Sequence, residues 1–241
     1  MDNRNLAVLE EIARLGEEAT ARRIADEVTL PQATVYRRIT DLENLGLVER
    51  AGRRYRIGSR LYRLLAAGTS TSELVSAVSP VLSGMAEATG EATFAARLVE
   101  KGIDLFQTCV PVNAKAAVVV PSKGLRPASI CSAAKAILAH VPGTLQKEII
   151  AAAEPLFPDL PAKKAAMLEG ELDQIRDCGI AYCIGEEDPD LASVAVSTQL
   201  NGAFGQMCVG VVGPRGRIMR KLETDLEKTL KLHGAKVDLD G

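Results

Sequence analysis

The chain has 241 residues, which is long for one average domain and short for three, so we expect two domains. Its 47% hydrophobic and 25% charged residues and its net charge of −2 are ordinary for a soluble globular protein. The sequence contains no run of about 18 uncharged apolar residues and no signal-peptide core, which excludes a membrane-spanning protein and predicts a cytoplasmic location.

Residues 1–47 carry the apolar spacing of three short helices, each bounded by a start or stop residue. Gly16 ends the first helix, and the Thr20 side chain can cap the second. Pro31 suits the first turn of the third helix, where its missing N–H would be unpaired anyway, and Gly46 ends that helix. The buried stripe of the third helix is expected to be Val35, Ile39, Leu42 and either Leu45 or Leu47.

Residues 47–58 predict two short strands joined by a turn at residues 51–54. Three helices followed by a hairpin predict a winged helix-turn-helix, whose third helix enters the major groove of DNA. The charge distribution agrees, because residues 1–67 contain twelve arginines and no lysine and carry a net charge of +2. A polyanion is therefore expected to meet only the N-terminal part of this otherwise acidic chain.

The expected contacts to double-stranded DNA fall into two groups. Six residues of the third helix lie off its core stripe: Gln32, Thr34, Tyr36, Arg37, Arg38 and Asp41. The first five are the expected DNA contacts on this helix. Glutamine can read adenine and arginine can read guanine in the major groove. Arg53 and Arg54 lie at the wing tip, where phosphate or minor-groove contact is expected. The alternative interpretation is that these arginines form a solvated helix face and a soluble turn.

A linker helix is predicted after the hairpin, from the leucines of residues 61–65 to a break at residues 68–72. A further helix restarts at Ser72. The predicted domains are therefore residues 1–68, which bind DNA and contain the start of the linker helix, and residues 69–241. The apolar face of the linker helix can pair with its copy in a homodimer or pack against the second domain, and both remain open.

The second module alternates strand and helix patterns, which predicts an α+β fold with helices on one or both faces of a sheet. Strands are predicted within residues 92–110, 114–124, 180–200 and 205–214. Helices are predicted within residues 128–141, starting at Ser129 or Ser132, and within residues 144–155, 161–179 and 216–234. The last range is predicted to be a single closing helix.

The sequence shows no metal-binding or cofactor-binding constellation, and no cofactor is expected. His140 and His233 are the two histidines, and both are interpreted as surface or capping residues. Zinc-ligand spacing and glycine-rich phosphate loops do not occur. The five cysteines contain no CxxC pair and are expected to be free thiols. The acidic run at residues 185–190 is interpreted as a solvated turn, with a divalent-cation site as the second interpretation.

Cys131 is the one candidate nucleophile, because it lies beside Ser132 and Lys135 at a predicted helix start, where a thiolate would be stabilised. No partnered base is evident in the sequence, which argues against nucleophilic catalysis.

These segments together resemble the IclR-type transcriptional regulators over nearly the whole chain. The residues that carry the resemblance are "LPQATVYRRITDLENLGLVER" with "RYRIG", "ASICSAAKAILAHV" and "GVVGPRGRI". The resemblance implies a GAF-like effector-binding domain that binds a small organic or aromatic acid, and homodimers or dimers of dimers on a palindromic operator. It also implies an effector pocket at the start of the "AKAILA" helix and the strand of residues 191–197, lined by Ser129, Cys131, Ser132, Ala192, Ser193 and Ala195.

The chain departs from the family pattern around that pocket. Ala134 stands where the family commonly has glycine, and Ala192 stands where it has a basic or polar residue. Residues 188–190 are Asp-Pro-Asp instead of Glu-x-Gly, and residues 196–197 are Val-Ser instead of Ala-Pro. These departures predict a less polar pocket with smaller walls.

The leading hypothesis is a ligand-responsive, sequence-specific DNA-binding transcriptional regulator and not an enzyme. Two alternatives remain at this stage. One is a DNA-bound assembly protein whose second domain has no ligand, and the other is an enzyme that uses Cys131 and carries a basic N-terminal domain.

Overall fold

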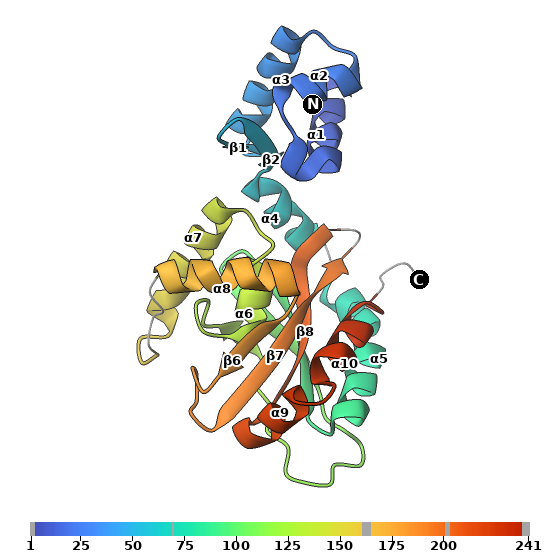
Figure 1. Ribbon diagram of the computed structural model, residues 1–241, viewed down its shortest axis with the longest axis vertical. Coiled ribbons are helices and arrows are strands. Elements are labelled where there is room, and N and C mark those ends of the chain that lie inside the picture. Colours follow the sequence, from blue (N-terminus) through green and yellow to red (C-terminus); the bar gives the residue numbers. More distant parts are fainter. Residues whose placement is uncertain (1–2, 69, 161–164, 201–202, 238–241) are drawn as a thin grey trace. The chain divides into compact units, whose positions relative to one another are not determined.

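The computed structural model describes residues 3–68, 70–160, 165–200 and 203–237. The chain divides into two compact units, Met1–Leu65 and Ala66–Gly241, and each is described by itself (Figure 1). Within the described residues, no helix has both the length and the apolar character needed to cross a membrane.

The smaller unit is the predicted winged helix-turn-helix. Its elements are α1 (Asn3–Leu15), a 3-10 turn (Gly16–Glu18), α2 (Ala21–Val28), α3 (Gln32–Asn44), β1 (Val48–Ala51) and β2 (Arg54–Ile57). The three helices and Tyr55 of the antiparallel hairpin enclose one apolar core. The predicted stripe of α3 is confirmed, with Leu47 buried and Leu45 exposed.

Local signals set the helix ends in this unit. The Thr20 side chain accepts a hydrogen bond from the Arg23 N–H (3.4 Å) and caps α2. Pro31 lies one residue before α3, and its carbonyl accepts the N–H groups of Thr34 and Val35. Gly46 follows α3 with φ +68°, a left-handed conformation that glycine adopts without steric cost. These contacts set where α2 and α3 begin and where α3 ends, and the first two residues of α3, Gln32 and Ala33, are exposed.

Two helices follow the hairpin, α4 (Ser59–Gly68) and α5 (Thr71–Thr89). α5 begins one residue before the predicted start. Ser70 forms a capping box with Glu73, in which each side chain bonds the other residue's N–H. α4 has no buried residue, and its Leu64 and Leu65 are exposed.

The larger unit is built on a six-stranded antiparallel sheet in the order β5-β4-β3-β8-β7-β6. Its strands are β3 (Ala92–Val99), β4 (Gly102–Cys109), β5 (Gly124–Arg126), β6 (Ala181–Ile184), β7 (Leu191–Leu200) and β8 (Ala203–Pro214). The helices after α5 are α6 (Ser132–Leu138), α7 (Gly143–Ala153), a 3-10 turn (Glu154–Leu156), α8 (Ala165–Cys178), α9 (Arg215–Leu222) and α10 (Leu226–Gly234).

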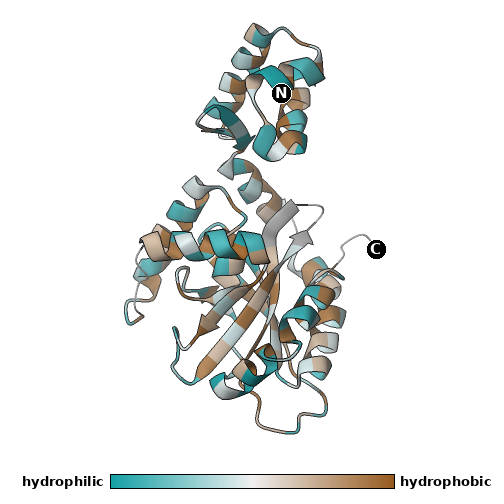
Figure 2. Ribbon diagram, in the orientation of Figure 1, coloured by the Kyte–Doolittle hydropathy of each residue, from teal (hydrophilic) through white to brown (hydrophobic). Residues whose placement is uncertain are grey.

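Helices cover both faces of this sheet. α6 contacts the central strands on one face and α8 lies over α6, while α5, α9 and α10 contact the sheet on the other face (Figure 1). Buried apolar residues of α5, α9 and α10 form one core cluster with residues of the central strands. The ribbon coloured by hydropathy shows that the helices carry both hydrophilic and hydrophobic residues (Figure 2). The predicted fold class is therefore confirmed, with an N-terminal winged helix-turn-helix and a C-terminal α/β domain.

Two predictions for the larger unit were wrong. Residues 114–123 form no strand, because the apolar side chains of residues 119–121 line a cavity and only Gly124–Arg126 pairs with β4. The closing helix is two helices, α9 and α10. The Thr224 hydroxyl donates to the Lys221 carbonyl (2.9 Å), and such a local bond competes with the helical pattern.

Candidate functional site

The first candidate surface is the exposed side of α3 with the wing. Gln32, Tyr36 and Arg37 are exposed on α3, and Arg53 and Arg54 are exposed on the hairpin. These side chains are not required by the core, so they are available to a partner. An α-helix of this kind fits the major groove, and a guanidinium group can bind both acceptors on the edge of guanine.

The two remaining predicted DNA contacts are less accessible. Thr34 is half-buried, and the Arg38 side chain is 18% exposed. Arg38 donates to Asn5 Oδ1 of α1 at 3.4 Å and lies 3.8 Å from Asp41. Arg38 therefore joins α1 to α3, which the sequence did not predict because the contact spans 33 residues.

The second candidate site is a cavity of about 410 Å³ in the larger unit. Cavities of this size are typical of small-molecule sites. Most of its wall is apolar, with contributions from the sheet (Phe94, Leu105 and Val212) and from the loop before β5 (Val119, Val120 and Pro121). Gly210 allows the Phe94 ring to lie close, since a Cβ at this position would come within 2.4 Å of Phe94 Cζ.

The six predicted pocket residues lie around this cavity in different ways. Cys131, Ala192 and Ser193 line it. Ser132 lies behind that wall, and its hydroxyl is 2.6 Å from the Ser193 hydroxyl. Ser129 and Ala195 are buried elsewhere, and Ser129 borders a smaller cavity of about 170 Å³. The start of α6 and strand β7 therefore meet at one wall of the larger cavity.

The polar side of the cavity comes from residues that the sequence reading missed. Arg126, at the end of β5, pairs with Glu187 of the β6–β7 loop. Two opposing effects act on the pKa of Arg126. Burial lowers the pKa, but the interactions with Cys131 and Glu187 together outweigh burial, so the pKa of Arg126 is raised. The guanidinium group therefore stays charged. The one sequence signal for Arg126 was its isolation, because it is the only arginine between Arg97 and Arg176.

The acidic run at residues 185–190 is only partly the solvated turn that was predicted: residues 188–190 are exposed, whereas residues 185–187 are half-buried. Glu187 pairs with Arg126, and Glu186 accepts from the buried Lys135 of α6 at 2.8 Å. Lys135 also donates to Glu171 of α8 at 3.2 Å, so it joins α6, α8 and the β6–β7 loop. Asp188 accepts the Asp190 N–H at 2.9 Å. Across the described ranges of the chain, no group of three or more His, Cys, Asp or Glu side chains is arranged to hold a metal ion.

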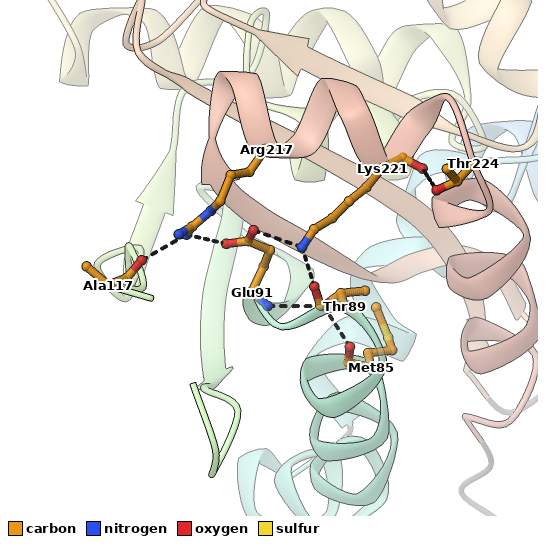
Figure 3. Close-up of polar contacts among 7 residues, drawn as sticks. All are labelled: Met85, Thr89, Glu91, Ala117, Arg217, Lys221 and Thr224. Carbon is orange, nitrogen blue, oxygen red and sulfur yellow. Dashed lines mark hydrogen bonds and ion pairs between the residues drawn. The ribbon is translucent and has the colours of Figure 1, made fainter. Parts of the chain in front are cut away.

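A buried ion-pair network holds the loop that forms another wall of the cavity (Figure 3). The Glu91 side chain is 1% exposed and accepts from Arg217 (2.6 Å) and Lys221 (3.1 Å), both on α9. Arg217 also donates to the Ala117 carbonyl at 2.8 Å, and Lys221 donates to the Thr89 carbonyl. The network therefore fixes the loop of residues 110–123 to the end of α5 and to α9.

The surroundings of the buried cysteines Cys183 and Cys208 do not favour a reactive thiolate. Burial raises the pKa of Cys183, which also lines the cavity, and burial raises the pKa of Cys208. A raised pKa reduces the thiolate fraction that nucleophilic attack requires. The Cys208 thiol donates to the Ala133 carbonyl at 3.5 Å, which is a structural contact between β8 and α6.

Both histidines, which were interpreted as surface or capping residues, are half-buried. His233 Nδ1 lies 2.9 Å from the Thr229 carbonyl near the end of α10, in keeping with the predicted capping role. His140 follows α6, where burial and then the nearby Arg176 lower its pKa from 6.5 to about 4.

The low pKa of His140 predicts a loss of stability in mild acid. The folded state favours the neutral imidazole, so its contribution is complete above pH 6.5 and is lost as the pH falls towards 4. Between pH 7 and pH 4.5 the thermal unfolding midpoint of the native chain should fall further than that of a His140→Gln variant. An imidazole NMR titration of the folded protein should give a His140 midpoint near 4, and a midpoint near 6.5 would contradict the prediction.

Two family models together match almost the whole chain. The model of the bacterial transcriptional regulator IclR C-terminal domain matches residues 66–239, and the IclR helix-turn-helix model matches residues 3–52. The chain belongs to the IclR family. Its IclR-type helix-turn-helix carries the exposed α3 surface, and its IclR-type C-terminal domain contains the cavity.

Individual relatives agree with the family models. The HTH-type transcriptional regulator TtgV of Pseudomonas putida is 28% identical over 207 residues, which cover 85% of this chain and 77% of TtgV. A crystal structure of a putative IclR transcriptional regulator from Silicibacter has a TM-score of 0.61 at 21% identity, covering 97% of this chain and 94% of that one. The Thermotoga maritima IclR structure has a TM-score of 0.58 at 19% identity, with coverages of 97% and 95%.

The family assignment separates the regulator hypothesis from the enzyme hypothesis. An IclR-family chain is a transcriptional regulator with a DNA-binding helix-turn-helix and a C-terminal effector-binding domain. The matched proteins are named as regulators and not as enzymes, so an enzyme that uses Cys131 as nucleophile is set aside.

Proposed function

We propose that this regulator binds a palindromic operator as a homodimer and responds to a small organic or aromatic acid. Residues 1–68 are assigned to DNA binding, and residues 69–241 to effector binding and oligomerisation. The cavity beside Arg126 carries the proposal, because it combines a largely apolar wall with a cation held inside the domain. An acid with an apolar body matches both features.

On the DNA side, we assign base contacts to Gln32, Tyr36 and Arg37 on the exposed side of α3. Thr34 and Arg38 are assigned to the edge of the interface, where phosphate contact is expected, because both are half-buried. Arg53 and Arg54 of the hairpin are assigned to phosphate or minor-groove contact. Such contacts orient a protein on DNA without reading its sequence.

Homodimer formation is supported by α4. None of its residues is buried in the single chain, and two of its leucines are exposed to water: Leu64 is 55% exposed and Leu65 is 46% exposed. Pairing with a second α4 would remove these leucines from water, which is favourable by about 25 cal/mol per Å² of apolar surface. A dimer also presents two recognition helices to the two half-sites of a palindrome.

Operator binding is predicted to weaken steeply with salt and to change with one class of ligand. If about six phosphates are neutralised, affinity should fall on the order of a thousandfold between about 50 and 200 mM salt. The measurement is binding of the purified full chain to a labelled fragment of its own promoter region, with and without a panel of organic acids. A ligand acts only by binding one state of the regulator better than another.

The same assay separates the alternatives. Specific binding that an acid strengthens or weakens supports the proposed regulator. Specific binding that no small molecule alters would favour a DNA-bound assembly protein instead. Binding without preference for the promoter fragment would contradict the assignment of the α3 surface.

A further inference from the structure

An ion pair joins the two edges of the sheet across the cavity. β5 and β6 are the edge strands of the six-stranded sheet, with four strands between them. Arg126 ends β5, and Glu187 lies three residues after β6, yet their side chains are paired. Both residues line the cavity. The pair therefore closes the sheet around the space that a ligand would occupy.

The two partners differ in their access to water. The Arg126 side chain is 13% exposed, whereas that of Glu187 is 31% exposed and belongs to the loop of residues 185–190. Glu187 can therefore turn into solvent more readily than Arg126 can. The Arg126 Nε atom is buried and has no hydrogen-bond partner among the described residues, so the guanidinium group retains an unused donor inside the domain.

Charge determines which ligand can use that donor. Among the described residues that line the cavity, Arg126 is the one cation, and Glu187 and Asp188 are the two carboxylates. A ligand carboxylate added beside an intact Arg126–Glu187 pair would leave an uncompensated negative charge in a partly desolvated site, which is costly. If Glu187 turns out to water, the ligand takes its place on Arg126 and charge balance is kept.

We propose that Arg126 binds the anionic group of the effector and that Glu187 is an internal counter-ion which the effector displaces. This inference rests on the proposed function and adds the residues that select a monoanion. The displacement also breaks the only link that Arg126 makes to the β6–β7 loop among the hydrogen bonds of the described chain. Effector binding would therefore separate the β6–β7 loop from the end of β5, at the two edges of the sheet. The apolar wall holds the body of the acid.

The test compares matched acids and amides on the full-length protein. The probes are benzoate with benzamide, phenylacetate with phenylacetamide, and hexanoate with hexanamide, titrated by isothermal calorimetry at pH 7.5. Glu187→Gln removes the competing charge and keeps the side-chain size, so acids should bind about tenfold more tightly and amides unchanged. Arg126→Met should lose about tenfold or more in acid affinity and so abolish any preference for the acid.

The control is Arg97→Met. Arg97 is also a half-buried arginine paired with a carboxylate, Asp104, at 3.8 Å, but it does not line the cavity. This variant should keep the native affinities for every probe. Circular dichroism and thermal unfolding establish that each variant is folded, and Glu187→Gln alone suffices if Arg126→Met does not fold.

Two results would overturn the inference. One is equal acid affinity, or equal absence of acid binding, in native and Glu187→Gln proteins. The other is undiminished acid affinity in a folded Arg126→Met variant. If amides or acids still alter promoter binding in either case, the regulator function stands and only the role of the ion pair is wrong. A lack of any ligand effect on promoter binding would instead contradict the proposed function.

Discussion

Replacing Glu91 with alanine should lower the free energy of unfolding of the larger unit by about 3 kcal/mol, because removing one partner of a buried ion pair leaves the other charges uncompensated. Arg217 and Lys221 both donate to this 1% exposed carboxylate. The measurement is urea denaturation followed by circular dichroism. Hydrogen exchange should also become faster in residues 110–123, since Arg217 would lose the carboxylate that positions it against Ala117.

Asp173→Ala provides the control for this result. Asp173 pairs with Arg176 on the surface of α8, with side chains 63% and 42% exposed. Exposed pairs contribute about 0–1 kcal/mol, so this variant should unfold almost as the native protein does. A Glu91→Ala loss no larger than the Asp173→Ala loss would show that the buried network does not stabilise the domain.

The double variant Arg37→Ala with Arg38→Ala should abolish sequence-specific operator binding. A bidentate arginine contact to guanine contributes about 1–3 kcal/mol of discrimination, so the loss should reach about a hundredfold or more. Arg37→Ala alone should account for most of it, because Arg37 is exposed whereas Arg38 is held against α1 through Asn5. The measurement compares binding to the promoter fragment and to an unrelated fragment of equal length.

Arg14→Ala is the matched control for operator binding. Arg14 is an exposed arginine of the same unit, paired with Glu11 on α1 and outside the α3 surface. Its replacement should leave the preference for the promoter fragment intact. If the double variant also keeps its preference, α3 is not the recognition helix.

The smaller unit could be predicted from its sequence because its signals are local. Thr20, Gly46 and the turn at residues 51–54 each act on backbone groups within a few residues, and the apolar stripes match the helical period. Most strands of the larger unit followed from the same kind of pattern. The charge of the first 67 residues likewise indicated a polyanionic partner from composition alone.

Local pattern failed where a contact between distant residues decides the structure. The valines of residues 118–120 predict a strand, but Val119 and Val120 line the cavity. The preceding residue, Ala117, accepts a hydrogen bond from Arg217, which lies 100 residues away in sequence. The same limit applies to Arg38, whose contact with Asn5 reduced its exposure. Secondary-structure propensity depends on a residue and its neighbours along the chain. It contains no information on which residue, distant in sequence, contacts that segment in the folded protein.

By itself, the sequence determined the winged helix-turn-helix, the fold class of the second domain and the resemblance to the IclR regulators. Each of these depends on short-range spacing or on motifs that can be read in order. Only the tertiary structure brought Arg126 to Glu187 across 61 residues, and Glu91 to Arg217 across 126 residues. A charged side chain in a sequence can be solvated or buried, and its pairing is decided when the sheet closes and removes water from both partners.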